Sequence, residues 1–169
     1  FSPTLRQSAG APVMTRLARL LAPTNILLNL AASSKKRLFE HAALLFENHQ
    51  GLERGRVFDA LFARERLGST GLGDAVAIPH GRIKGLREAA AAVLRSNDPI
   101  PFDAPDGQPV RLLVFLLVPE HATEEHLELL SELAELMSDQ TVRQALMTTD
   151  DPLEVHRILS VWEPQLPTT

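Results

Sequence analysis

The chain has 169 residues, of which 44% are apolar and 22% are charged, and it contains no cysteine. This composition indicates one soluble globular domain, and it excludes a disordered chain, a fibre, a disulfide framework and a cysteine-ligated metal site. The 17 basic residues are outnumbered by 21 acidic residues and are scattered along the chain, which argues against a nucleic-acid-binding surface.

The two ends of the chain differ in composition from its centre. Residues 1–13 lack an initiating methionine and are rich in small and polar residues, so we expect a disordered arm or a non-native remainder there. The domain is expected to span residues 14–163, with residues 164–169 as a C-terminal tail. The longest apolar run, residues 112–118, is far shorter than the roughly 20 residues that cross a bilayer as a helix, so no membrane insertion is predicted. Because the absence of cysteine fits a reducing compartment, we expect a cytoplasmic location.

Hydrophobic spacing and capping residues predict four elements in the first part of the chain. In order, these are a short helix over 17–21, a buried strand over 25–30, a helix that Ser33 or Ser34 caps and Gly51 ends, and a helix from near Glu53 to Gly68. The apolar residues of the first long helix form a single stripe, which predicts a helix at the surface of the domain.

Three extended segments and two helices are predicted in the second part of the chain. The extended segments are 75–79, 89–95 and 110–118, with a Pro- and Asp-rich connection over 97–109 and a last strand that is central and buried on both faces. One helix begins at Thr123 with an apolar stripe of Leu127, Leu130, Leu133, Ala134 and Met137, and the other begins at Asp151 with Val155, Leu159 and Trp162 on its buried side. Because strands alternate with helices, the predicted fold class is α/β.

His80 differs from the other histidines in its surroundings. It follows Pro79, precedes Gly81 and comes after a stretch rich in glycine, serine and threonine over 68–73, which can direct hydroxyl and backbone N–H groups toward an anion. We expect Gly81 to leave the approach to the ring open. A neutral imidazole has a lone pair that can attack phosphorus without a separate base, so His80 is a candidate phosphoryl acceptor. The alternative is a histidine that closes a strand end by hydrogen bonding. Ordinary surface positions are expected for His41, His49, His121 and His156.

His126 is the second candidate. It falls in the first turn of the helix that follows the buried strand 110–118, where free N–H groups and the helix dipole favour an anion. Ligands of α/β sheets gather beyond the carboxyl ends of strands, and both His80 and His126 are expected just past such ends. We therefore predict that the two rings converge. The alternative is that His126 faces solvent.

Three other kinds of site lack the spacing that they need. The glycines of residues 68–73 follow the order G-x-x-G-x-G, whereas a dinucleotide site has G-x-G-x-x-G, and no G-x-x-x-x-G-K-[ST] loop is present. His121 and His126 are five positions apart, whereas the histidines of an H-E-x-x-H metal site are four apart. We therefore predict neither a cofactor nor a metal ion.

Two motifs carry a resemblance to a known family. Residues 64–73 are R-E-R-L-G-S-T-G-L-G and residues 77–81 are A-I-P-H-G, and together they resemble the enzyme IIA domains of the phosphoenolpyruvate-dependent phosphotransferase system, fructose/mannitol class. The resemblance is strongest to the nitrogen-regulatory branch and extends over residues 14–163. It implies one α/β domain with a mixed β-sheet flanked by helices on both faces, and a phosphoryl group carried on the ε nitrogen of His80. The chain departs from the family at Ala75, where relatives commonly have glycine.

The resemblance also implies roles for residues near His80. His126 matches the position of a second histidine beside the active one, and Arg64 matches an arginine that lies near the phosphoryl site in relatives. A guanidinium at that position would stabilise charge. The hydroxyls of Thr70 and Ser69 would donate to the phosphoryl oxygens. No metal or cofactor is required, since phosphoryl transfer depends chiefly on positioning and charge stabilisation.

The implied function is that of a phosphotransferase with a phosphohistidine intermediate, used for regulation. An HPr-like phosphocarrier donates its phosphoryl group to His80, and the phosphorylation state then controls binding to regulated proteins, for which relatives indicate potassium-transport and sensor-kinase components. Two alternatives stay open. One is a sugar-specific IIA subunit that passes phosphate to a transporter IIB domain, and the other is a protein-binding module whose His80 never carries phosphate. The sequence of residues 64–71, R-E-R-L-G-S-T-G, and the absence of a fused IIB or membrane segment favour the regulatory function over these alternatives.

Overall fold

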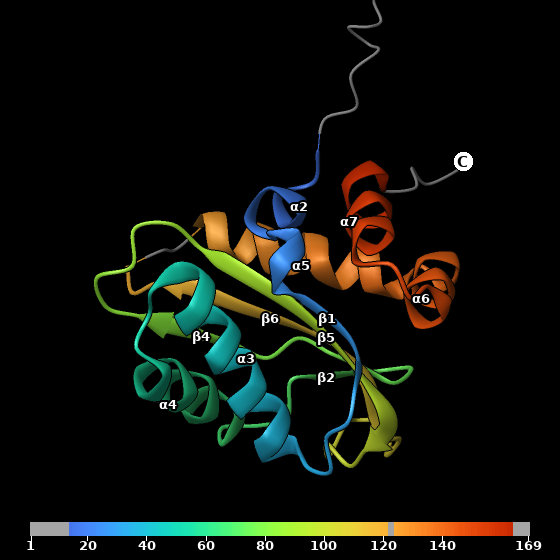
Figure 1. The fold of residues 1–169 in the computed structure, drawn as a ribbon, viewed down its shortest axis with the longest axis horizontal. Helices are drawn as coiled ribbons and strands as arrows, with labels where there is room; N and C mark the ends of the chain where they lie inside the picture. Colours follow the sequence, from blue (N-terminus) through green and yellow to red (C-terminus); the bar gives the residue numbers. More distant parts are fainter. Residues whose placement is uncertain (1–13, 122–123, 164–169) are drawn as a thin grey trace, which may run out of the picture.

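A mixed β-sheet lies between two layers of helices in the computed structural model, which describes residues 14–121 and 124–163 (Figure 1). Within these residues the sheet has six strands: β1 (Ile26–Leu30), β2 (Gly71–Gly73), β3 (Val76–Ala77), β4 (His80–Ile83), β5 (Ala90–Ile100) and β6 (Val110–Pro119). The order across the sheet is β1-β5-β6-β3-β2, and β4 pairs with β6 further along the edge that β3 occupies. The β1–β5, β3–β6 and β4–β6 pairs are parallel, and the other two are antiparallel. The predicted α/β class with a mixed sheet is confirmed.

Helices cover both faces of the sheet, as predicted. In the described residues they are α2 (Arg16–Leu20), the short 3-10 helix η1 (Pro23–Asn25), α3 (Lys35–Gln50), α4 (Arg54–Glu65), α5 (Glu124–Ser138), α6 (Gln140–Thr148) and α7 (Pro152–Val161). Figure 1 shows α3 and α4 on one side of the sheet and α2, α5, α6 and α7 on the other. Among these helices none is both long enough and apolar enough to span a membrane.

β6 contributes alternate residues to two hydrophobic clusters, one on each face of the sheet. Toward α3 and α4 it presents Leu113, Phe115 and Leu117, and toward the opposite helices it presents Leu112, Val114, Leu116 and Val118. Successive side chains of a strand point to opposite faces, so an almost unbroken apolar run supplies both clusters. β6 is therefore central and buried on both faces, as predicted.

The ends of α3 lie where its capping residues predict. The Ser34 hydroxyl accepts a hydrogen bond from the backbone N–H of Arg37, and Gly51 ends the helix in a left-handed conformation with φ of +69°. A side-chain oxygen at the N-cap satisfies a helix N–H, and glycine adopts positive φ without a steric cost. On the buried side of the helix, the ring of Phe39 packs against Phe62 and Phe115 at centroid distances of 4.7 and 5.3 Å.

α6 has no counterpart among the predicted elements. The Asp139 carboxylate caps it by accepting from the N–H groups of Thr141 and Val142, and Val142 and Leu146 lie four residues apart on its buried side. Both signals are present in the sequence, but they are confined to nine residues between two stronger helices.

Two extended regions also differ from the predictions. The stretch 71–73, predicted as part of a loop, is strand β2 and forms a hairpin with β3. β5 continues to Ile100, although residues 97–100 were expected to belong to the connection. The register shifts between Arg95 and Ile100, and this irregularity lets a strand that contains a proline return to pair with β6.

The buried face of α5 is rotated from the predicted stripe. Leu127 is 67% exposed, whereas His126, Leu129 and Leu133 are buried. Leu130 and Ala134 lie at the edge of this face and are only partly buried. Since several positions of this helix are leucine, hydrophobicity alone does not determine which of them meet the core.

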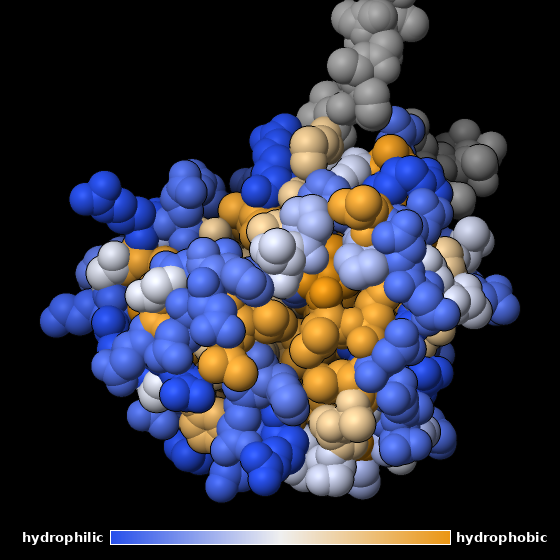
Figure 2. Space-filling model, in the orientation of Figure 1, coloured by the Kyte–Doolittle hydropathy of each residue, from blue (hydrophilic) through white to orange (hydrophobic). Residues whose placement is uncertain are grey.

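β1 forms one edge of the sheet and leaves an apolar strip at the surface. Figure 2 shows apolar atoms between α3 and α7, where β1 runs with Leu27 and Leu28 half-buried. Asn29 has a φ of +58°, and the register with β5 shifts between Leu27 and Leu30. An irregular edge of this kind is a poor template for pairing with another chain.

Candidate functional site

His80 is the first residue of β4, opposite Leu116 of β6. It was expected at the end of a strand over 75–79, but β3 ends at Ala77 and a new strand begins at His80 itself. Ile83 belongs to the cluster on the α3–α4 face, so strand alternation places His80 and Arg82 on the α5 face.

Gly81 faces away from the His80 ring, toward α4. A Cβ atom at Gly81 would lie 2.9 Å from both the carbonyl carbon and the oxygen of Ala60, and 3.1 Å from the backbone nitrogen of Leu61. The expectation that Gly81 clears the approach to the ring is therefore wrong. Its absent side chain lets α4 pack directly on β4, and α4 carries Arg64 and Glu65.

The His80 ring is oriented by a hydrogen bond to the main chain. Its Nδ1 lies 2.9 Å from the carbonyl oxygen of Ile78. A carbonyl oxygen only accepts, so Nδ1 carries the hydrogen and donates it, and Nε2 holds the lone pair of the neutral ring. The hydrogen bond expected of a histidine that closes a strand end is thus present, and it leaves Nε2 as the ring nitrogen with a free lone pair.

Burial and nearby charges keep the His80 ring neutral. Burial is the largest cause of the lowered pKa of His80 and is opposed by the hydrogen bond to Ile78. The positive charges of Arg64 and Arg82 lower this pKa further, and the negative charge of Glu65 raises it. Because the balance lies below the ordinary value of 6.5, the ring is neutral at pH 7.

His126 shares this site. It lies in the first turn of α5, and only 6% of it is exposed, so the alternative of a solvent-facing ring is wrong. Burial lowers the pKa of His126, and the charges of Arg82 and then of His80 lower it further. The two histidines are therefore close enough to act on each other electrostatically, although one comes from a strand and the other from a helix 46 positions later.

Two arginines, Arg64 and Arg82, act electrostatically on His80, and Arg82 also acts on His126. Arg64, in the last turn of α4, donates from Nη1 to the carbonyl oxygen of Gly68 at 2.8 Å, which fixes its side chain beside the turn that leaves the helix. Arg82 was not among the predicted site residues. Its Nη1 donates to the carbonyl oxygen of Glu120 at 2.9 Å. Its position two residues beyond His80 in a strand is the signal that could have identified it.

The hydroxyls of Ser69 and Thr70 donate to protein acceptors in this structure. The Ser69 hydroxyl donates to the carbonyl oxygen of Phe102 at 2.8 Å, and that of buried Thr70 donates to Glu65 at 2.6 Å. Either hydroxyl would have to give up this bond to donate to a phosphoryl oxygen.

Glu65 connects these parts of the site. Its carboxylate accepts from the backbone N–H of Thr70 at 3.1 Å and forms an ion pair with Lys35 at 2.6 Å. Lys35 lies at the start of α3, so one buried carboxylate joins α3, the end of α4 and the stretch before β2. The sequence motif contains Glu65, but its partner Lys35 lies thirty positions away and carries no local signal.

The departure at Ala75 has a conformational consequence. Asp74 and Ala75 form the turn between β2 and β3 with φ of +55° and +66°. Two consecutive positive φ values are typical of the tight hairpin turn that favours glycine at its second position. The chain therefore keeps the turn that glycine would favour, with an alanine in a conformation that costs energy.

None of the other described histidines is among the groups that shift the pKa of His80 or, apart from His80 itself, that of His126. His121 and His49 are exposed, and His41 is half-buried on α3. His156 is half-buried, and its Nε2 lies 3.0 Å from the carbonyl oxygen of Ala18, which links α7 to α2. Among the described residues, no group of three or more histidine, aspartate or glutamate side chains is arranged to hold a metal ion.

Known proteins resemble this chain over most of its length. The family model described as "Phosphoenolpyruvate-dependent sugar phosphotransferase system, EIIA 2" matches residues 19–161. A nitrogen regulatory protein from Pseudomonas aeruginosa is 43% identical over 147 residues, which cover 86% of this chain and 96% of that protein.

Solved structures show the same fold. The crystal structure of nitrogen regulatory protein IIA-Ntr from Neisseria meningitidis has a TM-score of 0.82 and 51% identity, and the match covers 86% of this chain and 99% of that one. The crystal structure of IIA mannitol from Escherichia coli has a TM-score of 0.69 at 23% identity, covering 82% and 97% of the two chains, and this likeness concerns the fold alone.

Proposed function

The chain belongs to the EIIA 2 family of the phosphoenolpyruvate-dependent sugar phosphotransferase system, and we propose that it is a nitrogen-regulatory IIA protein that accepts a phosphoryl group on His80. The observation that carries the proposal is the orientation of the His80 ring, whose Nδ1–H is donated to the Ile78 carbonyl. This bond leaves Nε2 as the nitrogen with a lone pair, and the lowered pKa keeps the lone pair available at pH 7.

The donor in this reaction is an HPr-like phosphocarrier with a phosphohistidine. The Nε2 lone pair of His80 forms a new N–P bond, while the N–P bond in the carrier breaks and its electron pair returns to the carrier's imidazole. The phosphorylated His80 ring gains positive character, which strengthens the Nδ1–H bond to the Ile78 carbonyl. Proton transfer to a separate base is not needed, because the attacking nitrogen carries no hydrogen.

The neighbouring groups stabilise the charge of the phosphoryl group. We assign Arg64 to electrostatic stabilisation and His126 to support as a neutral hydrogen-bond donor, because the pKa of His126 is lowered and its ring lies beside that of His80. The hydroxyls of Ser69 and Thr70 hold the segment between α4 and β2 in position through their hydrogen bonds to Phe102 and Glu65. These hydroxyls can donate hydrogen bonds to the phosphoryl oxygens only if those bonds open.

The phosphorylation state would then control partner binding. A dianionic group on a half-buried ring changes the charge of the surface that a partner must contact. Potassium-transport or sensor-kinase components are the partners expected from the family resemblance. Regulation is favoured over a sugar-specific role because the relatives at 43% and 51% identity are named nitrogen regulatory proteins, whereas the mannitol protein is 23% identical.

Labelled phosphoenolpyruvate, enzyme I and an HPr-type carrier test the proposal. We expect acid-labile, base-stable label on the peptide that contains His80, and no label on a His80→Ala variant. A His121→Ala variant is the matched control, because the side chain of His121 is 94% exposed, and it should take label at the wild-type rate. Label on serine, threonine or another histidine, or none from any carrier, contradicts the proposal and favours a plain protein-binding module.

The same assay tests the support role of His126. Loss of one aimed donor slows transfer by about 10–1,000-fold, and we expect a decrease of this size in a His126→Ala variant that still takes label on His80. Transfer at the wild-type rate would show that His126 is not part of the machinery.

A further inference from the structure

Arg82 is a charged residue of this site for which neither the motifs nor the family resemblance gives a role. It follows His80 by two positions in β4, so its side chain leaves the same face of the strand, and alternate strand residues are about 7 Å apart. An arginine side chain can span that distance. We propose that Arg82 binds the phosphoryl group on His80 together with Arg64, so that two guanidinium groups hold it. This inference rests on the proposed function.

The guanidinium of Arg82 is positioned but not neutralised. One of its N–H groups donates to the carbonyl oxygen of Glu120, which follows β6 on the way to the helix that carries His126. Over residues 14–121 and 124–163, no carboxylate forms an ion pair with Arg82. A guanidinium has five N–H donors in a planar fork, so a neutral tether to one of them leaves others for an anion.

Arg64, the other cation that acts on His80, has the same arrangement. It too is held by one carbonyl oxygen, that of Gly68, and it forms no ion pair within the described residues. Two cations, each fixed by a neutral acceptor, thus act on one half-buried imidazole. Arg82 also acts on His126, so its charge reaches both rings. A dianionic phosphoryl group is the partner that would neutralise this pair, and a bidentate contact to each guanidinium would orient it.

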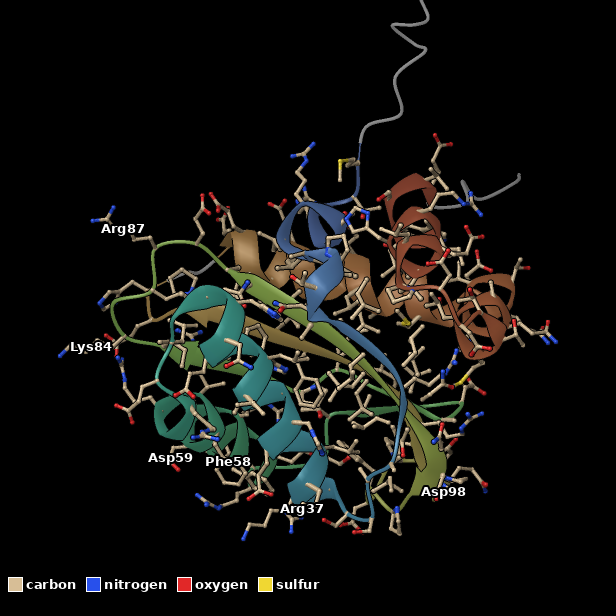
Figure 3. All side chains as sticks on the ribbon, viewed as in Figure 1. Arg37, Phe58, Asp59, Lys84, Arg87 and Asp98 are labelled. Carbon is tan, nitrogen blue, oxygen red and sulfur yellow. The ribbon has the colours of Figure 1, made fainter. Side chains whose placement is uncertain are left out.

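Other basic residues of the same region are not placed in this way. Figure 3 shows the side chains of Lys84 and Arg87 pointing outward from the connection between β4 and β5. Arg87 therefore offers a control with the same charge in the same stretch of chain, pointing into solvent. If net positive charge around the site were all that mattered, removing Arg87 and removing Arg82 would have similar effects.

The first experiment measures how the phosphoryl group is distributed at equilibrium between the carrier and this protein, in the wild type and in Arg82→Gln, Arg82→Lys and Arg87→Gln variants. A charge-assisted hydrogen bond is lost in Arg82→Gln, so we expect the equilibrium to move toward the carrier by about 10–100-fold. Arg82→Lys should recover part of this change and Arg87→Gln should show none. An equilibrium for Arg82→Gln equal to that of Arg87→Gln overturns the inference.

The second experiment keeps this inference separate from the proposed function. Inorganic phosphate is titrated into the unphosphorylated protein while the imidazole nitrogen resonances of His80 and His126 are followed by NMR. We expect phosphate to shift both rings and to bind at least about tenfold more weakly to Arg82→Gln. If the wild type takes no label from any carrier, the proposed function fails, and this titration alone decides the role of Arg82. Equal phosphate affinity in the wild type and Arg82→Gln, with intact melting temperatures, overturns the inference that Arg82 binds the phosphoryl group.

Discussion

Glu65 and Arg95 are two buried charges on opposite faces of the sheet, and they differ in what they hold in place. The Glu65 side chain is 2% exposed and faces the α3–α4 layer, whereas that of Arg95 is 4% exposed and reaches α6. Glu65 accepts from Lys35 and twice from Thr70, immediately beside Arg64. Both networks bury a charge among polar partners, but only that of Glu65 includes the neighbours of His80.

The Arg95 network stabilises a different part of the molecule. Its guanidinium donates to the carbonyl oxygens of Leu146 and Thr149 at the end of α6, and it forms an ion pair with Asp150 at 2.8 Å. The last carbonyl groups of a helix lack partners within the helix, and Arg95 supplies them. Arg95 lies opposite Leu112 of β6, whereas His80 lies opposite Leu116, so this network is displaced along the sheet from the site. Buried charge therefore joins separate elements of the fold at both places, and it adjoins the candidate site at only one.

Glu65→Gln should have the largest effect, because it leaves the Lys35 ammonium without its anion. We expect a loss of about 3 kcal/mol in the free energy of unfolding, together with slower phosphoryl acceptance by His80. Urea denaturation and the acceptance assay measure the two effects. Glu40→Gln is the control, since Glu40 pairs with Arg37 on the exposed side of α3 and should change stability by less than about 0.5 kcal/mol. Equal stability of the two variants would contradict the structural role assigned to the Glu65–Lys35 ion pair.

Arg95→Met should destabilise the protein by about 2 kcal/mol, because it leaves buried carbonyl groups of α6 without a donor. The folded variant should accept the phosphoryl group on His80 at the wild-type rate. Asp150→Asn is the control, and its effect should be below about 1 kcal/mol because the Asp150 side chain is 75% exposed. A decrease in acceptance as large as that of Glu65→Gln would show that the two networks are coupled.

Gly81→Ala tests the close approach of α4 to β4 on the Glu65 side. The added methyl group would meet the backbone of Ala60 at 2.9 Å, so α4 must move, at a cost of about 1–3 kcal/mol. Acceptance should slow as well, since Arg64 and Glu65 move with the helix. Gly55→Ala places a methyl group on α4 beside the flexible end of Glu53 and should leave acceptance unchanged. Wild-type stability of Gly81→Ala in thermal unfolding would contradict this account.

Ala75→Gly should stabilise the protein by about 1 kcal/mol, because glycine adopts the φ of +66° without the clash that a Cβ atom causes. The turn belongs to neither charged network, so acceptance should not change. Ala77→Gly is the opposite control: Ala77 is a buried strand residue, and its replacement should lower the free energy of unfolding. A decrease in stability for Ala75→Gly would mean that the turn does not carry the strain inferred from its dihedral angles.

The pH dependence of acceptance gives the smallest but most selective comparison. The pKa of His80 is lowered, so acceptance should hold at full rate above pH 6.5 and decrease only at pH values below it, as the ring takes up a proton. Glu65 raises this pKa, so Glu65→Gln should move the midpoint to a still lower pH, and Arg95→Met should leave it in place. NMR titration of the His80 ring measures the midpoint. A wild-type midpoint above 6.5, or equal shifts in both variants, would contradict the assignment of charges.

The candidate site was predictable where its parts are close in the sequence. His80, Arg64 and the stretch 68–73 lie within 17 positions, and their motif identifies them before any folding is considered. His126 could be proposed from its place in the first turn of a helix and from the family resemblance, but local spacing does not show which face of α5 meets the sheet. Arg82 was missed because its significance depends on strand β4 (His80–Ile83), and the predicted extended segment ended at residue 79.

The fold shows the same division. The apolar run of β6, the caps of α3 and the alternation of strands and helices determined the α/β class, because burial and hydrogen bonding act on each segment through its own residues. The stripe of α5 and the existence of α6 were decided by packing, since several faces of a leucine-rich or short helix are equally apolar.

By itself, the sequence determined which family the domain resembles and which histidine is the candidate phosphoryl acceptor. Only the three-dimensional structure decided that the Ile78 carbonyl accepts a hydrogen bond from Nδ1 of His80, that His126 is buried, and that Glu65 forms an ion pair with Lys35. The first of these depends on the backbone path between β3 and β4, and the other two depend on contacts between elements that are distant in the sequence. The energy of such contacts depends on distance and burial, which the order of residues does not specify.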